Sequence, residues 1–275
     1  VEDIDYLMDK KISSNAFTAS ILNLIYKKNI NVEEIKEKKN YKFKLLSKEN
    51  LNNSEKKLIK FLFEYVGNGK EFTVDELKKK SKVHSEKKYG FYDLYMEWKN
   101  EVEFDSMNQE FYLENTGFKV KYILYTILGF ILIGITWYTG NMTVLSYLGI
   151  VLSIIFIVYI TNIKKRTERG NEEYTKWKAF KRFLEDFGRF NEKELPEVKL
   201  WEKYLVYASI FGLAHKVQKS MKIQIKSMPD YNNNITIFDI YFYSILFDTL
   251  NNSISSSIST MNANHAQMVS NSSGN

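Results

Sequence analysis

The feature that most constrains this chain is a run of 42 residues, 122–163, without any Asp, Glu, Lys, Arg or His, although 26% of the whole chain is charged. A straight helix of that length would extend about 63 Å at about 1.5 Å per residue, roughly twice the ~30 Å hydrocarbon layer of a bilayer. The run should therefore fold back on itself. A turn sequence occupies residues 138–141. We predict a two-helix transmembrane hairpin within residues 119–163, with spans at 122–138 and 142–160.

The cations beside this run predict its orientation. Lys119 and Lys121 precede the first span, whereas the turn between the spans carries no charge. The cations Lys164, Lys165, Arg166 and Arg169 follow the second span. Because Lys and Arg mark cytoplasmic ends, we expect a multi-pass plasma membrane protein with both ends of this chain in the cytoplasm. A pore or transport path would need ionisable or strongly polar groups inside the membrane, and the run has none.

Composition narrows the remaining classes. The 275 residues suffice for the hairpin and one or two soluble domains, and the absence of Cys excludes disulfides and thiolate chemistry. The net charge is +6, and most of the surplus lies after the hairpin. Attraction to anionic lipid headgroups explains that placement. Residue 1 is Val, and residues 1–11 lack a signal-peptide pattern, so we expect a fragment of a longer protein.

The region before the membrane predicts a first winged-helix-like unit at residues 1–50. Ser13 or Ser14 can cap a helix with apolar residues at helical spacing that ends near residues 27–29. Residues 30–35 and 41–45 then resemble two short strands. Helix followed by hairpin is the order of a winged helix.

The same order recurs at residues 51–118 and predicts a second winged-helix-like unit. Ser54 can cap a helix that stops at Gly67, and residues 73–76 form a capping box for the next helix. A third helix is expected at about residues 85–101, and residues 104–113 could supply its wing. The fold class that we expect is mainly α with small β-hairpins.

Winged helices suggest nucleic-acid binding, but that is only an analogy of fold. The best cationic patch comprises Lys78, Lys79, Lys80 and Lys82. Arg makes the commonest specific contact with guanine, and residues 1–165 contain no Arg. A charge run on a helix is usually a solvated face. A membrane-tethered nucleic-acid-binding regulator is therefore the alternative, and a protein-interaction or packing role for this region is our first interpretation.

Residues 164–250 predict a cytosolic juxtamembrane helical region. An amphipathic helix is expected at residues 172–187, a second from 198 or 199 to about 222, and a membrane-surface or partner-facing helix at 235–250. Residues 251–275 form a polar Ser/Asn-rich tail whose end we expect to be disordered. Contact with a membrane surface or an unknown protein partner is one interpretation of the aromatic and basic residues here, and core packing is the other. The candidates are Trp177, Lys178, Phe180, Lys181, Arg182, Trp201, Tyr204, Lys164, Lys165 and Arg166.

No catalytic constellation is evident. His84, His215 and His265 are far apart and lack a metal-binding spacing. No GxSxG elbow or Walker-type glycine loop accompanies the many Ser and Asp residues. We therefore predict no catalytic, cofactor-binding or metal residues. The function that we expect is that of a non-catalytic membrane anchor or protein-interaction protein.

Several segments resemble the bacterial predicted-membrane-protein family called domain of unknown function 2207. The most specific is YTKWKAFKRFLEDF at 174–187, followed by Leu195-Pro196, WEKYLVYA at 201–208 and GLAHKV at 212–217. NAFTASILNL at 15–24 is similar to the first cytosolic helix of the family. The resemblance covers about residues 1–225. It implies an external domain led by a signal peptide and one more span upstream, and it brings no catalytic residues or substrate.

Overall fold

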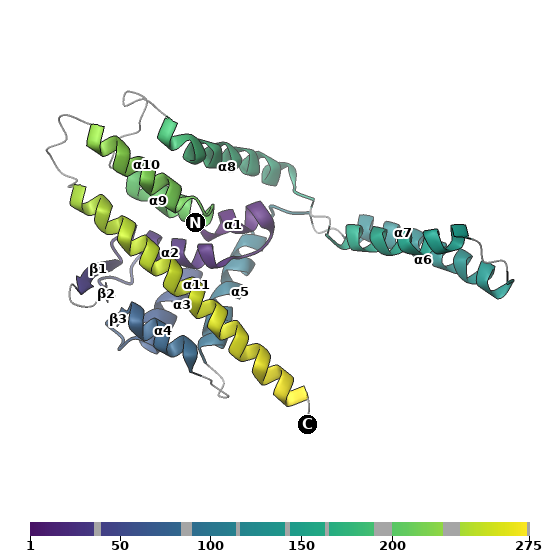
Figure 1. Ribbon diagram of the computed structural model, residues 1–275, viewed down its shortest axis with the longest axis horizontal. Coiled ribbons are helices and arrows are strands. Elements are labelled where there is room, and N and C mark those ends of the chain that lie inside the picture. Colours follow the sequence, from purple (N-terminus) through teal and green to yellow (C-terminus); the bar gives the residue numbers. More distant parts are fainter. Residues whose placement is uncertain are drawn as a thin grey trace. The chain divides into compact units, whose positions relative to one another are not determined.

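The computed structural model describes residues 1–35, 40–83, 90–113, 116–140, 144–162, 165–189, 200–227 and 237–273. The chain divides into two compact units. Unit 1 comprises Val1–Gln109 and Glu173–Asn275, and unit 2 comprises Glu110–Glu172. Helices predominate, and unit 1 contains a small antiparallel sheet (Figure 1). The prediction of a mainly α fold with a small β element is confirmed at this level.

The N-terminal part of unit 1 alternates helices with short strands. Its elements are α1 (Glu2–Asp9), α2 (Ser14–Tyr26), β1 (Ile30–Ile35), β2 (Asn40–Leu45), α3 (Asn53–Ile59), a π-helical turn (Lys60–Val66), β3 (Glu71–Thr73), α4 (Val74–Lys82) and α5 (Phe91–Met107). The predicted helix after Ser13 and the two predicted strands are confirmed as α2, β1 and β2. Helix α1 was not predicted.

One sheet joins the two winged-helix-like segments that were predicted separately at residues 1–50 and 51–118, and both lie largely in unit 1. Its strand order is β1-β2-β3, and both pairs are antiparallel. Phe43 of β2 lies opposite Phe72 of β3, and their rings stack with centroids 4.6 Å apart. Strand β3, from the second winged-helix-like segment, thus adds to the β1–β2 hairpin of the first, because Phe43 and Phe72 are buried together.

The predicted second wing at residues 104–113 is wrong. Phe104 to Met107 form the last turn of α5. Tyr112 instead forms an isolated antiparallel bridge with Arg166, which is 54 residues away in the sequence. The segment that was predicted to form a wing therefore belongs partly to a helix and partly to a contact within unit 2.

Aromatic side chains dominate the core of unit 1. The ring centroid of Phe17 in α2 lies 4.9 Å from that of Trp98 in α5 and 5.9 Å from that of Phe61 in the π-helical turn, in each case edge to face. Trp98 is fully buried. Such ring pairs add about 0.5–1.5 kcal/mol beyond the burial of their area. The core thus ties helices together that are up to about 80 residues apart in sequence.

Local caps set several element boundaries. Helix α3 begins after Asn52 rather than at the predicted Ser54, because Asn52 Oδ1 accepts from the backbone N–H of Glu55 at 2.7 Å. The predicted capping box at Thr73 is confirmed, with Glu76 as its partner. The predicted stop at Gly67 is also confirmed, and a Cβ there would lie 2.1 Å from the backbone oxygen of Glu71.

The C-terminal part of unit 1 is helical. Its elements are α8 (Glu168–Asp186, which begins in unit 2), a 3-10 turn (Phe187–Arg189), α9 (Trp201–Ile210), α10 (Ala214–Ser227) and α11 (Ile237–Ser273). The predicted amphipathic helix is confirmed as α8. The single helix predicted from 198 or 199 to 222 is wrong, because the chain turns between α9 and α10. Gly212 makes that turn with φ at 68°.

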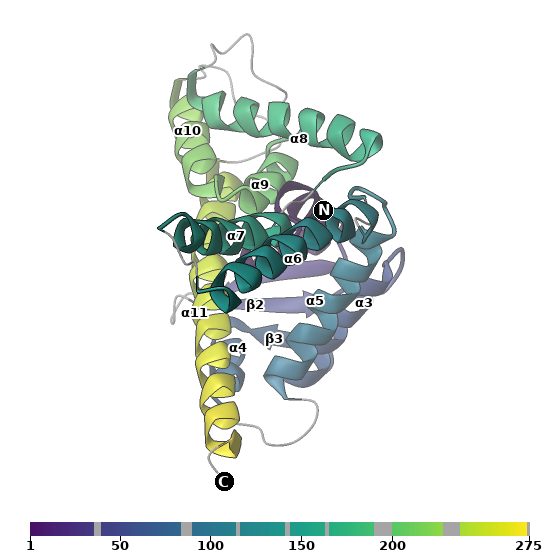
Figure 2. The same cartoon turned by 90° about the vertical axis from the view of Figure 1, so that its right-hand side faces the viewer.

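The expectation that the end of the tail at residues 251–275 is disordered is contradicted as far as Ser273, where α11 ends. Ser and Asn are poor helix formers, so packing must hold this part in a helix. A stripe of side chains at helical spacing is buried, namely Leu246, Leu250, Ile254 and Met261. Figures 1 and 2 show α11 running alongside α4, and it also contacts α2 and α10. A helix was predicted at 235–250 with a membrane-surface or partner-facing role, and α11 buries Leu246, Phe247 and Leu250 of that segment while Ile245 stays exposed.

Candidate membrane-contact site

Two apolar helices, α6 (Thr116–Tyr138) and α7 (Val144–Asn162), make up most of unit 2 and pack along each other. Among the described residues, Val120–Tyr138 is long and apolar enough to cross a membrane, and Tyr147–Ile160 is a shorter apolar helix. Large apolar side chains point outward, as Leu124 and Leu152 do with 59% and 64% of their surface exposed. Such a surface suits lipid rather than water.

Few groups pack between α6 and α7. Tyr122 meets Phe156 edge to face at 6.1 Å, and Gly149 brings the backbone of α7 close to Ile133. The hydroxyls of Thr126 and Thr136 donate to backbone oxygens one turn earlier in α6, at 2.7 Å each. These hydroxyls bond to the backbone of their own helix, so they do not line a polar path.

A short ladder joins the chain before α6 to the chain after α7. We call residues 110–113 and 165–170 the base clamp. The backbone N–H of Leu113 donates to the oxygen of Lys165 at 2.9 Å, and the N–H of Thr167 donates to the oxygen of Phe111 at 3.0 Å. Tyr112 and Arg166 form the bridge between these two bonds. The clamp therefore holds the two ends of the helical pair together.

Thr167 and Gly170 connect the base clamp to helix α8. The hydroxyl of Thr167 donates to the backbone oxygen of Glu110 at 2.8 Å and accepts from the N–H of Gly170 at 2.9 Å. A Cβ on Gly170 would lie 2.0 Å from the backbone oxygen of Phe111, so only glycine allows this approach. Sequence reasoning missed the clamp. Its one local signal is the Thr three residues before Gly170, at a helix start.

Cations lie over aromatic rings in the base clamp. The guanidinium carbon of Arg166 is 5.5 Å from the ring centroid of Tyr112, and that of Arg169 is 6.0 Å from the ring of Phe111. Lys165 and Arg169 are exposed, and Arg166 is half-buried. The structure thus brings the predicted residues Lys165 and Arg166 together, whereas Lys164 lies outside the described residues.

In unit 1, the predicted aromatic contact residues form a seam between α8 and α9. The ring centroids of Trp177 and Tyr207 lie 5.2 Å apart, and those of Phe180 and Tyr204 lie 5.7 Å apart. The seam ends where Phe187 and Trp201 meet at 5.6 Å. The two helices thus pack their aromatic faces against each other, as predicted for core packing.

The seam leaves some of these residues unavailable for surface contact. Trp201 is 1% exposed, and burial raises the pKa of Tyr204. Trp177 packs partly buried against Ile4 and Ile210. For Trp201 in particular, the interpretation as a membrane or partner contact is therefore wrong.

The predicted cations of α8 divide into exposed and half-buried groups. Lys178 and Arg182 are exposed, and the ammonium of Lys178 lies 5.6 Å from the ring centroid of Tyr174. Lys181 is half-buried, with its ammonium 6.0 Å from the ring of Phe211. Lys178 and Arg182 therefore remain candidates for contact with lipid headgroups or a protein.

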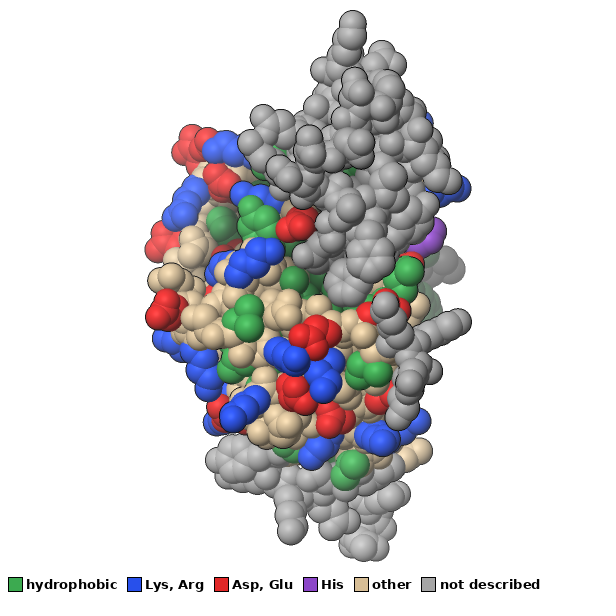
Figure 3. Space-filling model, turned by 90° about the vertical axis from the view of Figure 1, so that its left-hand side faces the viewer, with side chains coloured by type: hydrophobic (Ala, Val, Ile, Leu, Met, Phe, Trp, Pro, Cys, Tyr) green, Lys and Arg blue, Asp and Glu red, His purple; other side chains and the backbone are tan. Residues whose placement is uncertain are grey.

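The nucleic-acid alternative gains no support from the geometry. Lys78, Lys79 and Lys82 are exposed on α4, but Lys80 is turned toward the ring of Tyr65 at 4.9 Å. Helix α11 lies along α4 and occupies one of its flanks (Figure 2). The face of the molecule in Figure 3 intersperses basic and acidic side chains. A groove-binding helix would need an open cationic face, and α4 does not offer one.

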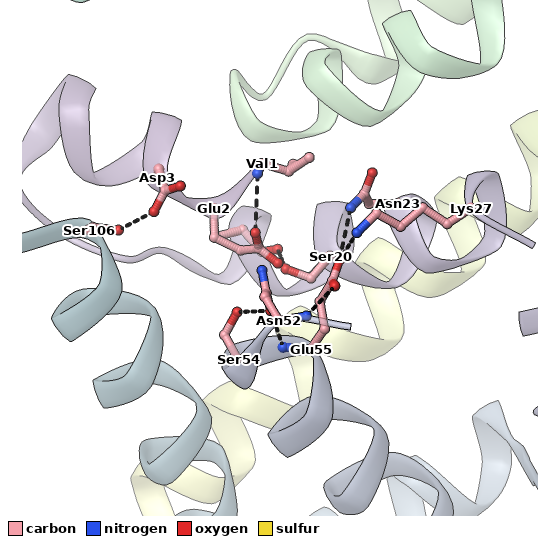
Figure 4. Close-up of polar contacts among 11 residues, drawn as sticks. Val1, Glu2, Asp3, Ser20, Asn23, Lys27, Asn52, Ser54, Glu55 and Ser106 are labelled. Carbon is pink, nitrogen blue, oxygen red and sulfur yellow. Dashed lines mark hydrogen bonds and ion pairs between the residues drawn. The ribbon is translucent and has the colours of Figure 1, made fainter. Parts of the chain in front are cut away.

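Buried polar groups in unit 1 connect helices. Glu55 Oε1 accepts from Asn23 Nδ2 at 3.2 Å and from Lys27 Nζ at 2.7 Å, which joins α3 to α2 (Figure 4). Ser106 donates to Asp3 at 2.8 Å, which joins α5 to α1. Within the described ranges, no group of three or more His, Asp or Glu could hold a metal ion. These contacts join helices of unit 1 to one another.

Among the described residues, unit 1 has an apolar pocket between α2, α9 and α11, with Leu22, Leu205 and Phe247 in its wall. Ser81, Asp93 and His265 line another pocket, beside the stacked rings of Tyr92 and His265, whose centroids are 3.8 Å apart. The hydroxyl of Ser81 donates to the backbone oxygen of Lys78 at 3.0 Å, and Asp93 Oδ2 accepts from the N–H of Gly90 at 3.1 Å. These bonds tie two of the three groups to the backbone.

Comparison with known proteins gives one match. No curated protein and no solved structure matches the chain. A family model does match, over residues 3–221, and its description is "Predicted membrane protein (DUF2207) C-terminal domain". The match covers unit 2 and most of unit 1, and it stops before α11. The chain therefore belongs to the DUF2207 family of predicted membrane proteins.

Proposed function

We propose that this protein is a non-catalytic membrane anchor that holds a protein-interaction domain at the cytoplasmic face of the plasma membrane. Helices α6 and α7 form the hairpin of this anchor. Helix α7 has 19 residues, and at about 1.5 Å per residue it extends about 28 Å, close to the ~30 Å hydrocarbon layer. Both helices expose apolar side chains of the kind that lipid covers.

The base clamp is the observation that carries the proposal. It bonds the chain just before α6 to the chain just after α7, so the start of α6 and the end of α7 lie at the same end of the helical pair. Lys165, Arg166 and Arg169 cluster at that end, whereas the turn at Thr139 and Gly140 carries no charge. The positive-inside rule then puts the clamped end, and with it both segments of unit 1, in the cytoplasm.

Unit 1 is the part that would bind a protein partner. Its described residues contain stabilising polar contacts and packed aromatic rings, and no group of three or more His, Asp or Glu among them could hold a metal ion. Its surface exposes single large apolar side chains, among them Leu46 and Phe104. Anchoring at a membrane raises the effective concentration of such a surface for partners that are confined there.

Single-cysteine labelling tests the topology, because the chain has no native Cys. Cys is introduced at Glu49, Thr139 or Lys178, each of which is exposed. In intact cells, a membrane-impermeant thiol reagent should label only the variant at position 139. The other two should react after permeabilisation.

The same experiment separates the hairpin from a single span. With one span, positions 49 and 178 would lie on opposite sides, and one of them would react in intact cells. Labelling of both 49 and 178 from outside would reverse the orientation. Either result would overturn the proposal.

A further inference from the structure

Arginine is distributed very unevenly in this chain. There are four Arg and 35 Lys, and all four Arg lie between residues 166 and 189. Two of them, Arg166 and Arg169, belong to the base clamp. Lys is evidently the default cation of this protein, so a position that holds Arg calls for a reason beyond charge.

Ring contact is not that reason. In unit 1 the ammonium of Lys80 lies 4.9 Å from the ring of Tyr65, and that of Lys178 lies 5.6 Å from the ring of Tyr174. These distances match those of Arg166 and Arg169 in the clamp. Lysine therefore serves for cation–π contacts elsewhere in the same chain.

Ion pairing is not the reason either. Lys27 pairs with Glu55 at 2.7 Å, and Lys57 pairs with Glu101 at 2.6 Å. Nor does the positive-inside rule distinguish Lys from Arg. What only Arg offers is a planar guanidinium with five N–H donors, a shape that can grip a phosphate through two parallel hydrogen bonds.

The base clamp places two such groups at one end of the hairpin. Its ladder fixes the backbone at Arg166, and the cap at Thr167 fixes the start of α8, where Arg169 follows. The guanidinium carbons of Arg166 and Arg169 lie over the rings of Tyr112 and Phe111, at 5.5 Å and 6.0 Å from the ring centroids. Within the base clamp, Glu110 and Glu168 are the acids that accompany Lys165 and the two Arg, so its formal charge is +1.

We propose that Arg166 and Arg169 of the base clamp bind the phosphate group of an anionic membrane phospholipid, whose headgroup carries no cation of its own. The inference rests on the proposed hairpin, because the hairpin puts the clamp at headgroup level. It goes further in naming the ligand chemistry: guanidinium geometry, rather than charge alone, recognises the phosphate. The rings of Tyr112 and Phe111 then act as backing that orients the two donors.

The test is a lipid titration of the full chain in detergent micelles, followed by native mass spectrometry and by thermal unfolding. The lipids are phosphatidic acid, which presents a phosphate monoester, and phosphatidylcholine. The variant Arg166→Lys/Arg169→Lys keeps every charge. We expect it to bind phosphatidic acid roughly tenfold more weakly than the unchanged chain, since each Lys forgoes a paired hydrogen bond.

The matched control is Arg182→Lys/Arg189→Lys, which makes the same chemical change at the two arginines of unit 1. It should bind phosphatidic acid like the unchanged chain, and each single variant of the clamp should show part of the loss. Equal binding by the clamp variant would overturn the proposal. So would an equal loss in the control, or equal affinity of the unchanged chain for phosphatidylcholine.

A third arm replaces lipid with inorganic phosphate. Binding of inorganic phosphate with the affinity of the lipid, and with the same dependence on the two Arg, would make free phosphate the ligand and overturn the lipid assignment. Failure of the hairpin would show separately, in cysteine labelling of position 139. The clamp variant should keep the labelling pattern of the unchanged chain, because its charges are the same.

Discussion

At the scale of single residues, the carboxylate of Glu55 both caps its own helix and bonds to another. It is 1% exposed, completes the capping box of α3 with Asn52, and accepts hydrogen bonds from Asn23 and Lys27 of α2. Glu76 occupies the same position in the capping box of α4, but it is exposed. Comparing Glu55 with Glu76 therefore separates the stabilisation by a helix cap from that by hydrogen bonds between α3 and the end of α2.

Replacing Glu55 with Ala should lower the free energy of unfolding by about 2–3 kcal/mol, because a cap and two further hydrogen bonds are lost. Glu76→Ala should cost about 1 kcal/mol, the usual value for a cap. Denaturant titration in detergent micelles, followed by circular dichroism, measures both. Equal losses in the two variants would show that the contacts with α2 contribute nothing.

Asp5 gives a pH dependence. It is largely buried and its Oδ2 accepts from the backbone N–H of Ser13 at 2.6 Å, but burial raises the pKa of its carboxyl above its ordinary value of 3.8. Between 3.8 and the raised pKa, the folded protein binds more protons than the unfolded chain. The free energy of unfolding should therefore fall as pH rises through this interval.

The variant Asp5→Asn should remove this fall and raise stability at pH 7, because an Asn oxygen can still accept from Ser13. Thermal unfolding from pH 3.5 to pH 7 measures the effect. Glu49→Gln, at an exposed acid, controls for the change in net charge. A steeper fall in Asp5→Asn than in the unchanged chain would contradict the assignment.

At the scale of elements, the base clamp determines how α6, α7 and α8 connect. Two backbone segments meet there, and Gly170 approaches Phe111 more closely than any side chain would permit. By contrast, a Cβ on Gly134 in the middle of α6 would meet no atom within 4 Å. The two glycines have the same chemistry and different surroundings.

Gly170→Ala should therefore disrupt the clamp and lower the unfolding temperature, at a cost of about 2 kcal/mol or more, since backbone atoms must shift. Gly134→Ala should be neutral or slightly stabilising, because Ala favours a helix. Thermal unfolding in micelles compares the two. Equal unfolding temperatures would mean that the clamp does not hold the ends of the hairpin.

At the scale of the whole molecule, α11 lies beyond the family match and covers α4 and α2. Ending the chain after Ser227 should expose the apolar surface beneath α11 and destabilise unit 1, at a cost on the order of 5 kcal/mol. Amide hydrogen exchange in α4 should accelerate. Labelling of a Cys at position 139 should stay as in the unchanged chain, because unit 2 has its own contacts. Unchanged exchange in α4 would contradict this role of α11.

The sequence by itself determined features that depend on neighbours along the chain. The length of the uncharged run predicts a pair of apolar helices, and α6 and α7 are such a pair. The capping box at Thr73, the stop at Gly67 and the strands β1 and β2 follow from short-range patterns. Such signals are legible because each involves residues within a few positions of one another.

The tertiary structure decided what depends on partners far apart in sequence. It placed β3 beside β2, paired Tyr112 with Arg166, and buried Trp201 in the seam with α8. It also made a helix of residues 251–273, which local propensity alone would leave unfolded. The physical reason is the same in each case: burial against a distant surface contributes more free energy than the weak local preferences of the residues concerned.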